Sequence, residues 1–333
     1  MRRYTVVILL SLLGLITSCG RWAPTARSAT VAPGVTLAGS AIGGLPLDDL
    51  ATLLQRWAEE VATPARNAYR DPETQGLVPG VDGVRLDVTA TMAAIAAASP
   101  DAALAPVLVP VPPTVNLSDL PPAPIYNGST TRSAVAFVIN IAWGERFVPP
   151  MLAALGAAHT PATFCLVGRW AEAHPETVAS IIAAGKAAGT HYDFCNHGYR
   201  DHSWANLSQA QAYASITRAD RVIEQLTGSK PAFFSPHKGE WNAAVLAASR
   251  EAGHELILWS VDTIDWQNPS PATVLRRVLR KVGPGSIVLM HPTASTAEAL
   301  PALIAEVRAK GLRLVTLSQL LSPAGDPLAQ AEG

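Results

Sequence analysis

The chain has 333 residues, of which 49% are hydrophobic and 15% are charged, and this composition excludes an intrinsically disordered protein. Its 25 lysine and arginine residues nearly balance its 26 aspartate and glutamate residues, so no global field draws it to nucleic acid, and no nucleic-acid partner is expected. The length favours two domains, and neutral glycans or small molecules fit the charge balance as partners.

The N-terminal residues predict export from the cytoplasm. Two arginines precede an apolar run over residues 6–16, which is shorter than the roughly 20 residues of a membrane-spanning helix. Small residues then lead to Cys19, which resembles the acylated cysteine of a bacterial lipoprotein signal. We expect a signal peptide over residues 1–18, a lipid anchor at Cys19 on the outer face of the cytoplasmic membrane, and a tether over residues 19–34. A plain secretory signal with an incidental cysteine is the alternative.

Residues 35–114 predict a small α+β domain. One apolar helical face is expected after a Gly-Gly-Leu-Pro breaker and consists of Leu50, Leu53, Leu54, Trp57 and Val61. Alternation over residues 84–88 predicts a half-buried strand, followed by a helix over 89–98 and a strand over 107–111. The order resembles small peptidoglycan-binding modules ahead of cell-wall enzymes, with a ligand-free spacer as the alternative. A proline-rich linker is expected over residues 115–130.

Short apolar runs alternate with helical patterns through residues 131–323, before a tail over 324–333. The runs cover residues 134–141, 163–167, 191–195, 232–234, 256–260, 286–290 and 312–315. Strands that alternate with helices predict parallel strands covered on the outside. We therefore predict an α/β fold, a distorted and seven-stranded (β/α) barrel.

Cys165 and Cys195 lie in neighbouring predicted strands. Outside the cytosol they could form a disulfide, provided that their Cα atoms lie within about 7 Å. Bridges between adjacent parallel strands are geometrically awkward. Two buried thiols are therefore the favoured prediction, and the disulfide is the alternative.

Polar residues follow several of the apolar runs. Asn140 stands at the end of the first run, Asn196 and His197 follow the third, and His291 follows the sixth. The fifth run is followed by a group of polar and aromatic residues that includes Asp262, Asp265 and Trp266. A parallel barrel places its site at the C-terminal ends of its strands, so we expect these side chains to converge there.

Five ordered motifs in this half resemble those of the polysaccharide deacetylase (NodB homology) family, carbohydrate esterase family four. They are INIAWGE at 139–145, PATF at 161–164, NHGY at 196–199, LWSVDTIDW at 258–266 and IVLMHP at 287–292. The first motif is most similar to the sporulation-associated branch, where it runs Phe-Asp-x-x-Trp-Gly. The resemblance implies hydrolysis of N-acetyl groups on glycans such as peptidoglycan or chitin.

The resemblance also implies roles for individual residues. His291 fits the general acid, while Asp262 and Asp265 fit the motif that orients the acid and the base. The base position, an aspartate in active members, holds Asn140, whose amide cannot take a proton at neutral pH. The substrate groove is expected to contain Trp143, Trp266 and His237.

Active members of the family bind a divalent metal, usually zinc, through an aspartate and two histidines. The aspartate position holds Ile141, which cannot bind metal. The first histidine position holds His197, and the second holds Asp201, with His202 one residue later. We expect His197, His202 and Asp201 to be the zinc ligands if the protein is active, and no metal otherwise.

Two hypotheses follow from these departures. In the first, the protein is a glycan N-deacetylase in which water is activated without a carboxylate base. In the second, it is a catalytically silent glycan-binding or structural lipoprotein of the cell or spore envelope. The retained acid motif favours the first, and the substitutions at Asn140 and Ile141 favour the second.

Overall fold

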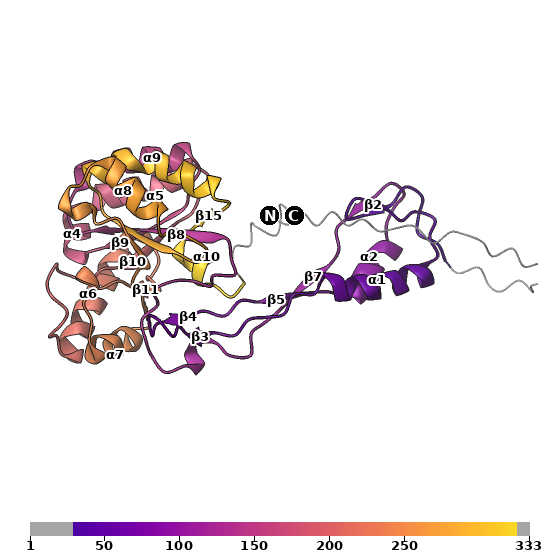
Figure 1. Cartoon of the computed structure of the whole chain (residues 1–333), viewed down its shortest axis with the longest axis horizontal. Helices are drawn as coiled ribbons and strands as arrows, with labels where there is room; N and C mark the ends of the chain where they lie inside the picture. The colour runs from indigo at the N-terminus through magenta and orange to yellow at the C-terminus, as the bar shows by residue number, and fades with distance from the viewer. Residues whose placement is uncertain (1–28, 325–333) are drawn as a thin grey trace, which may run out of the picture. The chain divides into compact units, whose positions relative to one another are not determined.

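The computed structural model describes residues 29–324. The predicted signal peptide, Cys19, the first part of the tether and most of the predicted tail lie outside these residues. Among the described helices, none combines the length and apolarity needed to cross a bilayer. The described chain divides into two compact units, one of residues 29–66 and 82–112 and one of residues 67–81 and 113–324 (Figure 1).

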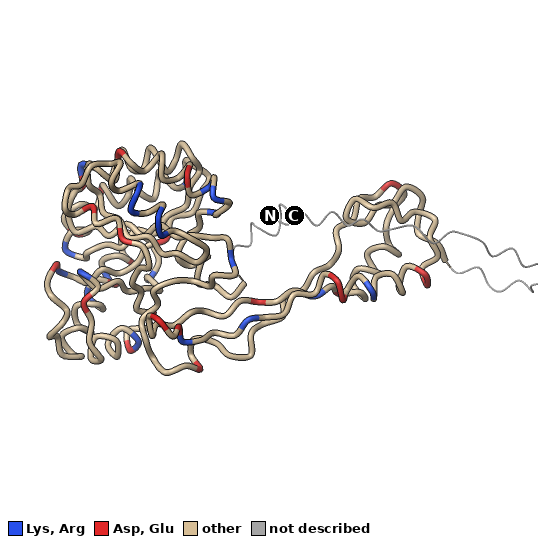
Figure 2. Tube along the Cα trace, in the orientation of Figure 1, with Lys and Arg blue, Asp and Glu red and all other residues tan. Residues whose placement is uncertain are grey.

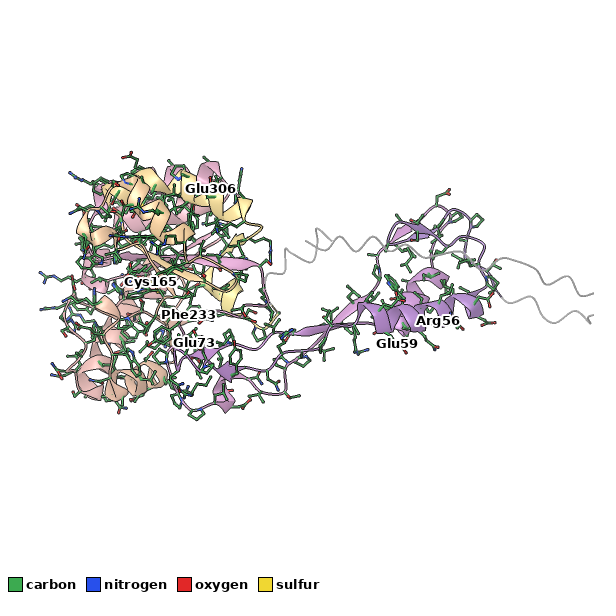
Figure 3. All side chains as sticks on the ribbon, viewed as in Figure 1. Arg56, Glu59, Glu73, Cys165, Phe233 and Glu306 are labelled. Carbon is green, nitrogen blue, oxygen red and sulfur yellow. A yellow bond between two sulfur atoms is a disulfide. The ribbon has the colours of Figure 1, made fainter. Side chains whose placement is uncertain are left out.

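The first unit is a small α+β unit. Its elements are β1 (Thr36–Leu37), β2 (Ser40–Ala41), α1 (Leu47–Val61), β5 (Gly83–Leu86), α2 (Val88–Ala96), β6 (Ala103–Leu104) and β7 (Leu108–Val111). Helix α1 buries Leu50 and Leu54 in its core, whereas Leu53, expected on the same face, is exposed. Leu50 and Leu54 are four residues apart and therefore lie on one side of the helix, so the buried apolar face is narrower than the predicted one. On the opposite side of α1, Arg56 and Glu59 point outward (Figure 3).

The boundary between the units differs from the predicted one. Residues 67–81, expected in the small domain, form the β3 (Tyr69–Arg70) and β4 (Leu77–Val78) hairpin of the second unit. The predicted linker contains a short 3₁₀ helix (Leu117–Asp119) and then pairs with the sheet of that unit. Ile125 N donates to Leu256 O at 2.9 Å and Leu258 N donates to Ile125 O at 2.7 Å. The second half of the predicted linker therefore pairs with the edge of the barrel sheet through Ile125.

The second unit contains a curved parallel sheet in the order β12-β11-β10-β9-β8-β14-β13, with β15 paired to the start of β8. Its strands are β8 (Ala134–Ile141), β9 (Ala162–Leu166), β10 (Tyr192–Asn196), β11 (Phe233–Phe234), β12 (Glu255–Leu256), β13 (Val261–Asp262), β14 (Ile287–Met290) and β15 (Arg313–Val315). The seven-stranded path confirms the predicted distorted barrel.

Helices cover the outside of this sheet, as Figure 1 shows. They are α3 (Val148–Ala157), α4 (Gly168–Ala173), α5 (Pro175–Ala187), α6 (Gln209–Thr227), α7 (Ala243–Glu251), α8 (Pro271–Leu279) and α9 (Ala294–Ala309), and the last helix of the unit is α10 (Leu317–Leu321). Three further 3₁₀ helices are Glu145–Phe147, His237–Gly239 and Asp265–Gln267. Side chains of α10 belong to the cluster inside the barrel.

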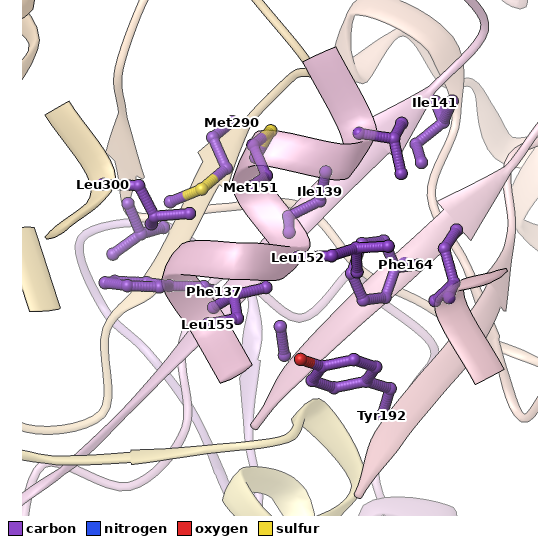
Figure 4. Packing of buried hydrophobic residues seen from close by; sticks show 14 of the residues in the cluster. Phe137, Ile139, Ile141, Met151, Leu152, Leu155, Phe164, Tyr192, Met290 and Leu300 are labelled. Carbon is purple, nitrogen blue, oxygen red and sulfur yellow. The ribbon is translucent and has the colours of Figure 1, made fainter. Parts of the chain in front are cut away.

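Side chains of β8 alternate between two apolar clusters. Phe137, Ile139 and Ile141 pack against the helices, together with Met151 of α3 and Phe164 of β9 (Figure 4). The alternate side chains, such as Val138, face the barrel interior. Because the period of a strand is two, Asn140 faces the interior, and its neighbour Ile141 faces the helices.

Cys165 and Cys195 form a disulfide across β9 and β10, with their Cα atoms 4.2 Å apart. The favoured prediction of two thiols is therefore wrong. The two cysteines are direct register partners, and both face the barrel interior (Figure 3). On the other side of β9, Cys165 pairs in register with Asn140 of β8. Strand pairing thus brings the sulfur atoms together without any movement of the backbone.

Candidate functional site

Polar side chains gather at the C-terminal ends of neighbouring strands. Met290 pairs with Ile139, so His291 comes level with Asn140 on the adjacent strand. Ile141 and Asn196 both pair with Leu166, which brings His197 to the same end of the sheet on the other side. The sheet register therefore places the predicted base, acid and histidine positions at the same end of the sheet.

Asp265 and His291 form a tightly bonded pair. His291 Nδ1 lies 2.8 Å from Asp265 Oδ1, and His291 N donates to Asp265 Oδ2 at 2.7 Å. Thr296 Oγ1 donates to the same Oδ2 atom. The carboxylate thus holds Nδ1 as the protonated nitrogen and leaves Nε2 of His291 for a ligand. Thr296 was missed from the sequence, although Thr293, Ser295 and Thr296 stand directly after His291.

The pKa of Asp265 reflects its environment. Burial of Asp265 opposes ionisation, but the hydrogen bond and charge of His291 and the hydrogen bond from Thr296 outweigh it and lower the pKa of the carboxyl below its usual value. Asp265 is therefore ionised near neutral pH.

The turn before Asp265 is held in an unusual backbone conformation. Ile264 has φ 51°, a left-handed conformation that β-branched residues rarely adopt. Asp262 Oδ1 accepts a hydrogen bond from Ile264 N at 2.8 Å, and Arg277 Nη1 donates to Thr263 O at 3.1 Å. Asp262, expected to orient the acid or base, thus braces the turn that carries Asp265 and Trp266.

Trp143 lies over the acid residue. Its ring stacks on His291 with centroids 5.9 Å apart, and 42% of Trp143 is exposed. Gly144 makes this contact feasible, because it has φ 83° and a Cβ there would lie 2.2 Å from Pro292 O. Trp266 is 55% exposed, so both tryptophans offer open aromatic surface at the strand-end site.

The base position is buried and incompletely paired. Asn140 is 2% exposed, and its Oδ1 has no hydrogen-bond partner among residues 29–324. Ile141 is fully buried in the apolar cluster under the helices (Figure 4). The structure thus shows an amide in place of a base and a hydrocarbon side chain in place of a metal ligand.

His197 and His237 lie against each other with ring centroids 3.9 Å apart. His197 Nδ1 is 2.5 Å from the carbonyl oxygen of Ser235, and His237 Nδ1 is 3.2 Å from Asp201 Oδ1. His237 is only 4% exposed, so it does not form an open groove wall as expected. Its position after β11, the strand next to β10, is the sequence feature that could have indicated this contact.

Both imidazoles are neutral near pH 7. Burial, followed by the neighbouring His237, lowers the pKa of His197 well below its usual value of 6.5. Burial, followed by the neighbouring His202, lowers the pKa of His237 to about 3. A neutral imidazole has one N–H donor and one acceptor nitrogen, and Nδ1 of His197, which lies against Ser235 O, is assigned as the donor of that ring.

The predicted zinc ligands point to different partners. His202 Nδ1 lies 2.8 Å from Arg200 O, and the His202 ring stacks on Trp204 with centroids 5.1 Å apart. The carboxylate of Asp201 faces His237. Within residues 29–324, no three histidine, cysteine, aspartate or glutamate side chains are grouped so as to hold a metal ion.

The donor set does not fit the metal that the family resemblance implies. Of the aspartate and two histidines, only His197 is present at its own position, while Ile141 is apolar and Asp201 is committed to His237. Binding of zinc by His197, His202 and Asp201 stays a prediction, and no chemical step is derived through it.

A buried network that the sequence did not reveal supports His197. Asn196 Nδ2 donates to Asp220 Oδ1 at 2.8 Å, and Asn196 Oδ1 accepts from Gly198 N at 2.6 Å. Asp220 Oδ2 also lies 2.9 Å from His254 Nε2. Asp220 and His254 come from α6 and the segment before β12, so only the fold brings them beneath the loop that carries His197.

Comparisons with known proteins agree with this geometry. Residues 127–257 match the family model described as polysaccharide deacetylase. YlxY of Bacillus subtilis, an uncharacterised protein, is 34% identical over 269 residues, which cover 81% of this chain and 82% of YlxY. A peptidoglycan-N-acetylglucosamine deacetylase of Bacillus cereus is 30% identical over 59% of this chain and 70% of its own length. The chain belongs to the polysaccharide deacetylase family.

A solved structure within the family bears on activity. The CE4 family pseudoenzyme BA3943 of Bacillus anthracis superimposes with a TM-score of 0.71 at 31% identity, over 83% of this chain and 96% of that one. A mutant of BA3943 described as having restored enzymatic activity gives the same TM-score. The proteins that this chain resembles therefore include one that is described as a pseudoenzyme.

Proposed function

We propose that the protein binds a glucosamine-containing envelope glycan, such as peptidoglycan or a chitin-like polymer, without releasing acetate from it. The observation that carries this proposal is the chemistry of the side chains at the C-terminal end of β8. Asn140 cannot accept a proton from water, and Ile141 is packed away from the site. Trp143 and Trp266 still offer aromatic faces on which sugar rings can pack.

The relatives support the choice of ligand class. Named relatives include deacetylases of peptidoglycan N-acetylglucosamine and of chitooligosaccharides. A protein with the same fold and an altered centre is expected to keep some affinity for the same polymers, because recognition uses the groove and not only the reacting atoms.

We place this binding protein in the cell envelope. The charge-flanked apolar run and Cys19 support export and lipid anchoring to the outer face of the cytoplasmic membrane. The Trp143-Gly144 pair supports membership of the sporulation-associated branch, and the glycine-rich order of the small unit supports a peptidoglycan-binding role for it.

The test compares binding with turnover in the same samples. Purified full-length protein is incubated with peptidoglycan, with and without added zinc, and both the sedimented protein and the released acetate are measured. We expect sedimentation with peptidoglycan and no acetate above background. Acetate release would instead establish the reorganised deacetylase, which the intact Asp265–His291 pair favours as the second candidate. If the protein neither sediments nor releases acetate, both functions fail.

Asn140→Asp tests whether the general base is the one catalytic group that is missing or whether several are missing. Loss of a general base typically lowers a rate by about 10²- to 10⁴-fold, so restoring it should raise acetate release by a similar factor if nothing else is missing. We expect no such rise, because the metal positions at Ile141 and Asp201 differ as well.

A further inference from the structure

The disulfide between Cys165 and Cys195 lies inside the barrel, where solvent does not reach it. Both cysteines are completely buried, and both belong to the interior apolar cluster. The other members of that cluster include side chains of β8, β11, β14, β15 and α10. Thiol–disulfide exchange requires a thiolate to reach a sulfur atom directly. The closed barrel therefore shields the bridge from oxidants and reductants alike.

The surroundings of the two cysteines also disfavour the reactive thiolate form. A thiolate is stabilised by a neighbouring lysine, arginine or protonated histidine, and it is disfavoured in apolar surroundings. Strands β8, β9 and β10 contain no lysine or arginine, and these residues occur in other segments of the barrel unit (Figure 2). Asp193, two residues before Cys195, faces the same side of β10 and accepts from Ser318 N at 2.8 Å. Its carboxylate opposes a second negative charge nearby.

The bridge joins two neighbours within one local unit of the chain. Cys165 and Cys195 are 30 residues apart and belong to the consecutive strands β9 and β10. The two residues are register partners, so the pairing of these strands alone brings the sulfur atoms together. In contrast, β11, β14, β15 and α10, which help to enclose the bridge, all follow Cys195 in the chain. The bridge can therefore form before the barrel closes.

We propose that Cys165 and Cys195 are oxidised before the barrel closes, by thiol–disulfide exchange with an external disulfide donor, and that the closed barrel then prevents reduction of the bridge. The thiolate of one cysteine attacks a donor sulfur atom, forms a mixed disulfide and releases the first donor thiolate. The thiolate of the other cysteine attacks the sulfur atom of the chain in this mixed disulfide and releases the second donor thiolate. The chain loses two electrons and two protons, and the donor becomes two thiols.

The donor belongs to a compartment outside the cytosol, because structural disulfides form and persist in oxidising environments. The sequence has three cysteines, and predicted acylation removes Cys19 from the pairing, so only one bridge is possible. Isomerisation of wrong bridges is therefore not required, and a disulfide donor alone completes the reaction. This inference does not depend on glycan binding. It requires the export that the N-terminal residues predict.

The first experiment measures access to the bridge in the folded protein. Full-length protein with Cys19→Ser has the pair as its only cysteines. It is incubated with dithiothreitol at about pH 8, near the ordinary thiol pKa, with and without concentrated urea, and thiols are counted by alkylation and mass spectrometry. We expect reduction to be at least about 100-fold slower without urea, because the folded protein must first open. A smaller difference would show that reagents reach the bridge in the closed barrel, and would overturn the proposal.

An exposed disulfide in the same protein is the matched control. Ala183→Cys places a thiol at an exposed position of α5, inside the loop that the bridge closes. Glutathione is first joined to this thiol, and its release by dithiothreitol is measured beside reduction of the bridge. We expect release to differ by less than about 3-fold with and without urea, because the site is open in both conditions. If release is slowed without urea as strongly as reduction of the bridge, burial does not protect the bridge and the proposal fails.

The second experiment tests the order of oxidation and closure. The Cys19→Ser protein is unfolded and reduced, then refolded with glutathione disulfide present from the start or added after refolding. Bridge formation is followed by alkylation, and folding by near-ultraviolet circular dichroism. We expect the bridge to form at least about 10-fold faster when the donor is present from the start. A reduced chain that stays unfolded until the donor arrives would also support the proposal, because oxidation again precedes closure. A reduced chain that folds completely and then forms the bridge equally fast would overturn it.

Discussion

The strand-end site has two halves that differ in how fully their polar atoms are paired. In the acid half, defined as Asp265, His291 and Thr296, both carboxylate oxygens accept hydrogen bonds and the imidazole is held in one orientation. In the base half, defined as Asn140, Ile141, His197, His237 and Asp201, two buried polar atoms have no hydrogen-bond partner within residues 29–324, and one position is apolar.

The difference separates orientation of a ligand from activation of water. The acid half holds the His291 ring in one orientation, with Nε2 left for a ligand and the ring stacked on Trp143. The base half has neutral imidazoles and an amide, and its one carboxylate, that of Asp201, faces His237. Hydrolysis of an amide requires both halves, whereas binding of a sugar requires only shape, aromatic surface and paired polar atoms.

Ile141→Asp tests whether the base half could regain a metal ligand. A carboxylate at this fully buried position would lie among apolar side chains, and we expect a loss of about 3–5 kcal/mol in the free energy of unfolding. Urea denaturation measures the loss, with Ile141→Leu as the control at less than about 1.5 kcal/mol. A loss from Ile141→Asp that is no larger than the control's would show that this side chain can turn into the site, and would break the contrast between the halves.

Asp265→Asn tests the acid half. The substitution removes charge-assisted hydrogen bonds from His291 and Thr296, and we expect a loss of about 1.5–3 kcal/mol at neutral pH. Asp262→Asn keeps the oxygen that accepts from Ile264 N and serves as the control with a smaller loss. Equal losses in the two variants would show that the acid pair is not specially stabilised.

The pH dependence of the same variant gives a second measurement. The folded-state pKa of Asp265 is lowered, so its ionised form stabilises the fold above the unfolded value of about 3.9, and this contribution is lost as pH falls through the folded pKa. The stability difference between the natural protein and Asp265→Asn should therefore shrink below about pH 4. A difference that stays constant down to pH 2 would contradict the assigned ionisation.

Much of the fold could be predicted because buried strands produce local apolar runs in the sequence. β8 spans the predicted residues 134–141, since an apolar run of this length is buried on both faces. The run over residues 256–260 predicted one strand, but in the structure β12 ends at Leu256 and β13 begins only at Val261. Pairing of Ile125 with Ile257 occupies this edge, and such long-range pairing leaves no local signal.

The candidate site could be predicted at the level of residues but not of partners. Asn140 and His291 were found because each ends a buried strand. The contact of His237 with His197 and Asp201 depends on the path of two loops, so spacing alone favoured Asp201 and His202 as ligands. The disulfide was missed for a related reason, because strand register, not sequence distance, brings Cys165 to Cys195.

Trp143→Ala tests whether the acid half contributes to glycan binding, and it has the smallest expected effect. The ring is half-exposed and stacked on His291, so its removal takes away a sugar-packing surface without opening the core. We expect peptidoglycan binding to weaken about 10-fold, the order of one stacking interaction, with the unfolding free energy changed by less than about 1 kcal/mol. Tyr213→Ala removes an exposed aromatic ring from α6 and should leave binding unchanged. Equal weakening in both variants would mean that the glycan does not pack over the acid half, and that His291 is oriented for some other ligand.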